Sequence, residues 1–257
     1  MDSKIKQVLP KIDLKIGRSD RKDSKPFSYY DLIDVLEHPG CPVCNLLVQK
    51  SDRYLDSIFS EMLLNPETQQ AFRERRGLCA LHSARATEYI GGSLEIAMLY
   101  TVGLEEVVNA LMEDSPNGNG SWLQNFTARS QSALENHLAP SGACAVCSYM
   151  VECEQRYIET LGKYISDRKL EKAFEASEGL CLPHFRIALR EINEDPARDL
   201  LVTLQKSIWT ELKRDLDSFI AKSNYLHQHE INPREGESWR RVMRIAGKSG
   251  VFGPDRF

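Results

Sequence analysis

Apolar residues recur every three or four positions along most of the chain, which is the spacing of one face of an α-helix. No stretch of convincing length alternates between apolar and polar residues, as a half-buried strand would. Pro39-Gly40, Asn65-Pro66 and Gly91-Gly92 interrupt the helical pattern in the first half. The pattern predicts an all-α fold. The expected helices cover residues 28–37, 46–64, 67–75, 79–89, 94–113, 121–138, 148–166, 168–177, a segment that carries Cys181 and His184, 197–223 and 236–246.

The second half of the chain repeats features of the first. Matching residues lie 102 or 103 positions apart, and their neighbours follow the same plan. The matching pairs are Cys41 with Cys144, Cys44 with Cys147, Cys79 with Cys181, His82 with His184, Tyr54 with Tyr157, and Phe72 with Phe174. A repeat of this length is too long for a solenoid and indicates a duplicated small domain. We therefore expect two tandem, pseudo-symmetric helical bundles.

Turn-forming residues divide the chain between the repeats. Residues 114–121 are rich in Asn, Gly, Ser and Pro, which favour a linker. The expected divisions are a basic tail over 1–26, a first helical repeat over 27–113, the linker, a second repeat over 122–226, and a C-terminal segment over 227–257. The last segment should carry a short amphipathic helix that docks on the core.

Composition excludes several functional classes. Of 257 residues, 42% are hydrophobic and 27% are charged, as in ordinary globular proteins. The net charge is −4, although residues 1–26 carry eight basic against four acidic side chains, so the body is acidic and does not resemble a nucleic-acid-binding core. No apolar run is long enough to predict a membrane span, and no signal segment is evident. Cytoplasm is the expected location, where C-x-x-C pairs indicate metal or redox chemistry rather than disulfides.

Each repeat contains one C-x-x-C pair and one C-x-x-H pair. Three thiolates and one imidazole form a common zinc set, and four protein ligands are typical of a structural rather than a catalytic ion. We expect two zinc ions per chain, with each repeat closing its own site. The expected ligands are Cys41, Cys44, Cys79 and His82 in the first repeat, and Cys144, Cys147, Cys181 and His184 in the second. Cys153 stands outside the plan, because its counterpart is Lys50.

Three functions remain open at this point. The first is a non-enzymatic, zinc-stabilised adaptor or regulator that binds a protein partner. The second is a redox or electron-transfer protein, since thiolate-rich sets also hold iron–sulfur clusters and zinc-bound thiolates can be oxidised. The third is an enzyme with a pocket between the two lobes, where clefts often form. The sequence shows no phosphate-binding glycine loop, no Ser/His/Asp set and no carboxylates paired at a catalytic spacing. It therefore favours no particular reaction.

Residues around the ligands resemble those of a known family. The segment His38-Pro39-Gly40-Cys41-Pro42-Val43-Cys44, both Gly-Leu-Cys-x-x-His motifs, and Glu237-Ser238-Trp239-Arg240-Arg241 with Gly247 and Gly250-Val251 are similar to an uncharacterised prokaryotic family, a domain of unknown function. The resemblance covers about residues 28–252. Ala145 replaces a proline that the family often has at this point, which leaves the ligands intact. The resemblance supports the ligand assignment and implies no reaction.

Overall fold

The structure, a computed structural model, describes residues 25–88, 92–113, 134–223 and 230–247. Its regular elements within these ranges are helices, without a strand, so the all-α prediction is confirmed. None of the described helices is long and apolar enough to cross a bilayer. The helices are α1 (Phe27–Val35), α2 (Pro42–Ser60), α3 (Pro66–Arg75), α4 (Ala80–Thr87), α5 (Ser93–Glu113), α7 (Ala145–Tyr164), α8 (Arg168–Glu175), α9 (Leu182–Glu191), α10 (Asp195–Lys222) and α11 (Pro233–Arg244).

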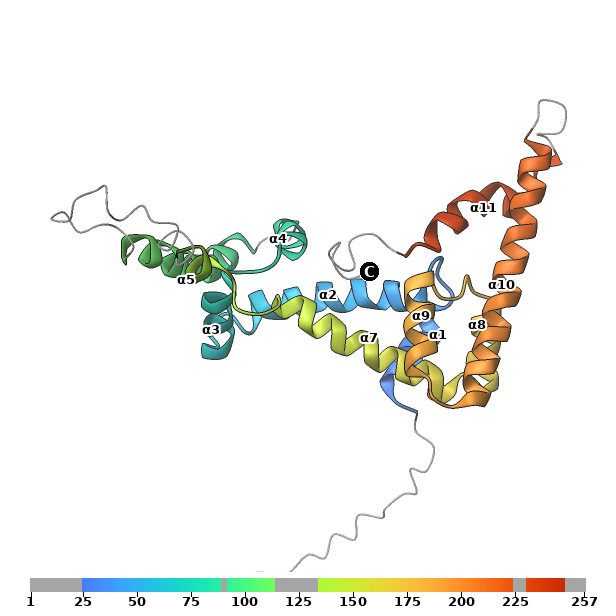
Figure 1. Ribbon diagram of the computed structural model, residues 1–257, viewed down its shortest axis with the longest axis horizontal. Coiled ribbons are helices and arrows are strands. Elements are labelled where there is room, and N and C mark those ends of the chain that lie inside the picture. Colours follow the sequence, from blue (N-terminus) through green and yellow to red (C-terminus); the bar gives the residue numbers. More distant parts are fainter. Residues whose placement is uncertain (1–24, 89–91, 114–133, 224–229, 248–257) are drawn as a thin grey trace, which may run out of the picture.

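An antiparallel pair of helices, α2 and α7, forms the centre of the molecule (Figure 1). Tyr54 of α2 stacks on Tyr149 of α7 with ring centroids 4.4 Å apart. Leu47 and Leu55 of α2 and Ile158 of α7 are almost completely buried, which places the hydrophobic core along this pair. Because the helices run in opposite directions, their N-terminal ends lie at opposite ends of the core.

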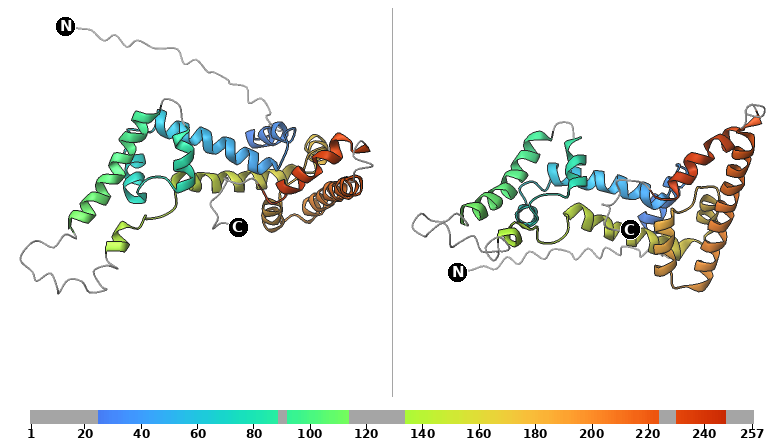
Figure 2. Two further views of the ribbon diagram at one scale, coloured as in Figure 1. Left: turned by 90° about the horizontal axis from the view of Figure 1, so that it is seen from above. Right: turned by 45° about the horizontal axis from the view of Figure 1, so that its top comes forward.

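The other helices gather at the two ends of this central pair (Figure 2). The α3, α4 and α5 helices lie at one end, and α8 to α11 lie at the other. The first-half helix α1 crosses to the second-half end: Tyr29 donates a 2.6 Å hydrogen bond to Asp167, and Asp31 accepts one of 2.7 Å from Tyr157. The halves therefore share a core instead of packing as two self-contained bundles.

Helix positions agree with the proposed duplication without establishing it. The starts of α2 and α7 are 103 residues apart (42 and 145), and those of α3 and α8, α4 and α9, and α5 and α10 are 102 apart. Pseudo-symmetry and the domain boundaries therefore stay predictions. Residues 134–138 are helical, but most of the helix expected over 121–138 lies outside the described residues. The same holds for the linker 114–121 and for residues 1–24 of the basic tail.

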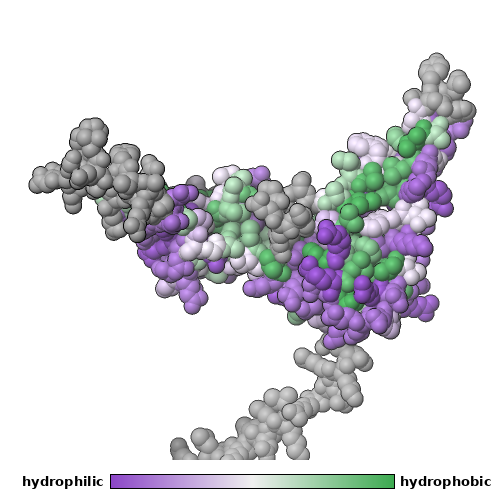
Figure 3. Space-filling view, in the orientation of Figure 1, coloured by the Kyte–Doolittle hydropathy of each residue, from purple (hydrophilic) through white to green (hydrophobic). Residues whose placement is uncertain are grey.

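The C-terminal helix α11 packs along α10. Asn232 forms a capping box with Glu235 at the start of α11, which fixes where the helix begins. Two hydrogen bonds then connect α10 with α11. Glu235 accepts one from Lys222 at 2.8 Å, and Arg241 donates one to Asp215 at 2.9 Å. Hydrophobic residues gather over α10 and α11 on the face seen in Figure 3. This packing brings the end of α11 to the start of α9.

Candidate metal centres

The structure brings the eight predicted ligands together in two groups of four. In each group the donor atoms all lie within 4.8 Å of one another. The first cluster consists of Cys41, Cys44, Cys181 and His184, and the second cluster consists of Cys79, His82, Cys144 and Cys147. Each is a Cys₃His set that can hold a metal ion.

The partners within each group differ from the expected ones. We predicted that each C-x-x-C pair would combine with the C-x-x-H pair of its own repeat, and that prediction is wrong. The antiparallel packing of α2 and α7 is the reason. It carries Cys44, at the start of α2, to Cys181 near the far end of α7, with the two Sγ atoms 3.8 Å apart. Each cluster thus joins the first half of the chain to the second.

All four ligand pairs occupy the same place on a helix. The first cysteine of each pair is the N-cap residue of its helix, and the second ligand lies three residues on, in the first turn. These two positions point to the same side of the helix start, next to the positive end of the helix dipole, which stabilises a thiolate. The C-x-x-C pairs therefore form the beginnings of α2 and α7, which start earlier than the helices expected over 46–64 and 148–166.

The separations between donor atoms fit a single tetrahedral ion. Metal–sulfur bonds of about 2.3 Å and metal–nitrogen bonds of about 2.0 Å at tetrahedral angles place sulfurs about 3.8 Å apart and sulfur about 3.5 Å from nitrogen. In the first cluster, His184 Nδ1 lies 3.5 Å from Cys41 Sγ, 3.3 Å from Cys44 Sγ and 3.1 Å from Cys181 Sγ. In the second cluster, His82 Nδ1 lies 3.2 Å from Cys79 Sγ, 3.7 Å from Cys144 Sγ and 3.4 Å from Cys147 Sγ, and Cys79 Sγ lies 3.7 Å from Cys147 Sγ.

The sulfurs of the first cluster compete for negative charge when no cation neutralises them. Burial and the neighbouring sulfurs raise the pKa of Cys41 well above that of an ordinary thiol. Hydrogen bonds from Cys181 and Cys41 lower the pKa of Cys44. Burial disfavours the imidazolium of His184, but hydrogen bonds to Cys181, Cys44 and Glu154 outweigh it and raise its pKa to about 11. A divalent cation would resolve this competition by displacing the protons.

A similar division of charge holds in the second cluster. Burial raises the pKa of Cys144, but hydrogen bonds from His82 and from backbone groups lower it overall, to about 6. Burial and the adjacent Cys144 and Cys79 raise the pKa of Cys147 to about 12. One sulfur of this set therefore ionises readily while another resists ionisation until a cation arrives.

Residues outside the motifs hold the first cluster in place, and repeat spacing alone did not reveal them. Glu154 Oε1 contacts His184 Nε2 at 3.0 Å, on the ring edge away from the sulfurs. Gln205 fixes the backbone before Cys181, because its Oε1 accepts a hydrogen bond from the Leu180 N–H at 2.8 Å. Glu178 accepts from the Gly40 N–H at 3.0 Å, which ties the two ligand segments together.

The end of α11 covers the first cluster. Arg244 donates two hydrogen bonds to Glu178, of 2.7 and 2.5 Å. The N–H of Leu182 donates to the carbonyl oxygen of Ile245 at 2.7 Å, directly beside Cys181. This C-terminal segment therefore closes the metal centre against solvent.

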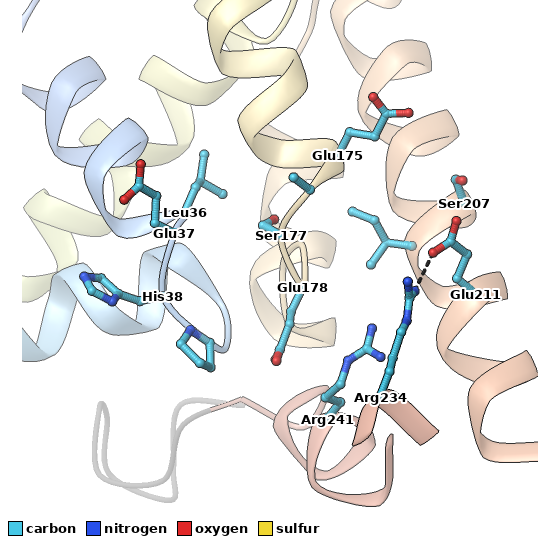
Figure 4. A pocket seen from close by; sticks show the side chains of 13 residues that line it. Leu36, Glu37, His38, Glu175, Ser177, Glu178, Ser207, Glu211, Arg234 and Arg241 are labelled. Carbon is cyan, nitrogen blue, oxygen red and sulfur yellow. Dashed lines mark hydrogen bonds and ion pairs between the residues drawn. The ribbon is translucent and has the colours of Figure 1, made fainter. Parts of the chain in front are cut away.

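A cleft of about 450 Å³ lies beside the first cluster (Figure 4). It is lined by the segment Leu36–Pro39 of the first half and by α8, α10 and α11 of the second. Arg234 donates to Glu211 at 2.5 Å and to Asp215 at 2.8 Å, and Arg241 also donates to Asp215. Both arginines of the lining are thus paired with carboxylates of α10.

All seven cysteines lie within the described residues, and none forms a disulfide. Cys153 belongs to neither cluster and is buried in α7.

Comparison with known families assigns the chain to one of them. The sequence model of a family of unknown function (DUF6062) matches residues 30–249, which is most of the chain. The chain belongs to that family. The predicted membership in a domain-of-unknown-function family is therefore confirmed, and the match includes all eight ligands. No curated protein and no solved structure matches the chain.

Proposed function

We propose that this protein is a zinc-binding, non-enzymatic adaptor or regulator whose two metal centres join the halves of a shared helical core. The observation that carries the metal part is the convergence of two Cys₃His sets from distant parts of the chain. Four protein donors complete a tetrahedral shell and leave no position for substrate, which is typical of structural zinc. A cytoplasmic location suits seven free thiols.

Donor spacing favours one ion over an iron–sulfur cluster. All donor atoms of a set lie within 4.8 Å of one another. A cluster of several iron atoms needs ligands spread around a larger body, whereas sulfurs 3.7 and 3.8 Å apart suit two ligands of the same metal atom. Among single ions, zinc combines readily with three thiolates and one imidazole.

Metal analysis of anaerobically purified full-length protein tests the zinc assignment. We expect two zinc ions per chain, no labile sulfide and no visible absorption. A brown protein that contains iron and sulfide would overturn the zinc assignment and favour electron transfer. A matched Cys153→Ser variant should keep both ions, because Cys153 lies outside both clusters.

Exposed apolar side chains support the adaptor part of the proposal. On α5, Leu104, Val108, Leu111 and Met112 are each more than two-fifths exposed and recur on one helix face. Contiguous exposed apolar surface of this kind usually binds another protein. The α3 helix packs against α5 at Gly103, which helical spacing places on the side of α5 away from Val108 and Met112.

The α5 face can be tested by substitution. We expect Leu104→Glu combined with Val108→Glu to abolish cross-linking to a partner in cells of origin, with zinc content unchanged. Glu105→Gln combined with Thr101→Ser, on the same helix, is the matched control and should keep the cross-link. An identical cross-linking pattern in both variants would rule out this face as the docking site.

A further inference from the structure

The two clusters have the same donor set but hold their histidines differently. In the first cluster, His184 Nε2 meets the buried carboxylate of Glu154 at 3.0 Å. In the second cluster, His82 Nε2 is buried and has no hydrogen-bond partner among the described residues. A carboxylate on the outer nitrogen of a ligating histidine fixes the tautomer and strengthens the metal bond. Within the part of the chain that the structure describes, the first histidine has this support and the second does not.

The position in the first half that corresponds to Glu154 lies on α2. The residue that corresponds to Glu154 in the first half is Ser51, 103 positions earlier, and its buried Oγ also has no hydrogen-bond partner among the described residues. Arg85 of α4 donates to the adjacent Asp52, with Nη2 2.8 Å from Oδ2, so α4 lies against this turn of α2. By the predicted repeat, the first half therefore has a short hydroxyl at the position where the second half has a carboxylate.

The second cluster is also less buried than the first. Every ligand of the first cluster is buried, whereas Cys79 and Cys147 of the second are half-buried. The end of α11 closes the first cluster through Arg244 and Glu178.

The helices that carry the two histidines also differ in packing. The α9 helix, with His184, packs against α7, whereas α4, with His82, takes part in none of the larger helix–helix contacts. Polar contacts that join α4 to other described helices are the Arg85–Asp52 pair, and Ser83 Oγ to Tyr100 Oη at 2.7 Å. The metal site therefore supplies a larger share of what holds α4 in place.

We propose that the second cluster is an exchangeable zinc site whose loss of metal releases α4, while the first cluster keeps its ion. This inference rests on the proposed zinc binding and deepens it by assigning the response to one site. Loss of the outer partner of a ligating histidine lowers metal affinity about 10- to 100-fold. Greater access to Cys79 and Cys147 adds a route for a competing thiol or chelator.

A chelator challenge of the zinc-loaded full-length protein tests the proposal. With a chromophoric chelator in excess, we expect two release phases of one ion each, with rates at least about tenfold apart. Hydrogen exchange of the same wild-type sample assigns the phases without a variant. Amides of residues 80–87 should lose protection with the fast phase, and amides of residues 182–191 only with the slow phase.

The role of Glu154 as a positioning residue is tested by Glu154→Gln. We expect the slow phase to accelerate about tenfold while the fast phase keeps its rate. Glu159→Gln, at an exposed position of the same helix, is the matched control and should change neither phase. General destabilisation of α7 would accelerate both phases, which separates it from an effect on His184.

Equal release rates, or loss of protection in residues 182–191 first, would overturn the inference and leave the zinc assignment standing. A protein without bound zinc would overturn the proposed function itself.

Discussion

At the residue scale, the backbone shortly before each C-x-x-H pair requires a glycine for steric reasons. Gly179 has φ +69°, and a Cβ at this position would lie 2.7 Å from the Gln205 side-chain amide, which holds Leu180. Gly77 has φ +101°, and its Cβ would meet Tyr100 at 3.0 Å. Residues with a Cβ atom rarely adopt such backbone angles. Both Gly-Leu-Cys motifs therefore contain a conformational requirement as well as a ligand.

Substitution of Gly179 should be costly. We expect Gly179→Ala to destabilise the protein by about 1 to 3 kcal/mol, because the left-handed backbone is strained for alanine and Gln205 must move. Thermal melting of the zinc-loaded protein measures the effect, as a fall of roughly 2–4 °C per kcal/mol.

The matched control is Gly236→Ala in α11, where an added Cβ would meet only Ile231, at 3.8 Å. Alanine should leave stability unchanged or raise it by about 0.5 to 1 kcal/mol in this helix interior. Equal melting temperatures for Gly179→Ala and the wild type would contradict the steric argument.

At the element scale, helix content was predictable and helix starts at the metal sites were not. Apolar spacing predicted the central helices near 46–64 and 148–166, whereas α2 and α7 begin at Pro42 and Ala145. Sequence rules place a helix start at Ser, Thr, Asp or Asn, whose side chains cap the backbone. Cys41 and Cys144 occupy the N-cap positions without a side-chain cap hydrogen bond. Their sulfurs face the clusters instead.

The residues that form the two clusters were predictable, but their pairing was not. Spacing singled out all eight, because thiol and imidazole pairs three residues apart are a strong metal signature. A 103-residue repeat is equally compatible with Cys44 meeting Cys79 and with Cys44 meeting Cys181. Only the antiparallel contact of α2 with α7, made by residues such as Tyr54 and Tyr149, decides between them. Long-range packing of this kind leaves no mark in local periodicity.

At the scale of the whole molecule, the exchange of partners has a direct chemical test. In the Cys44→Ser/Cys181→Ser variant, both changes fall in the first cluster. We therefore expect it to retain one zinc ion per chain, bound in the second cluster. Metal analysis after gel filtration, with circular dichroism to check helix content, measures the outcome.

The control is Cys44→Ser/Cys79→Ser, which removes the same number of sulfurs but damages both clusters. It should lose both ions. If this control kept one ion while Cys44→Ser/Cys181→Ser lost both, each repeat would close its own site after all.

The separation along the chain between residues of one cluster also determines when each cluster can form during synthesis of the protein. Cys44 and Cys181 are 137 residues apart in the sequence. At about 5 to 20 residues per second, a ribosome needs roughly 7 to 30 s to make the second half of that site after the first. Throughout this interval Cys41 and Cys44 lack the two residues that complete their cluster. The second cluster therefore cannot be complete before Cys147 has been made, nor the first before His184, and a ribosome that stalls at the linker leaves a fragment unable to complete either cluster.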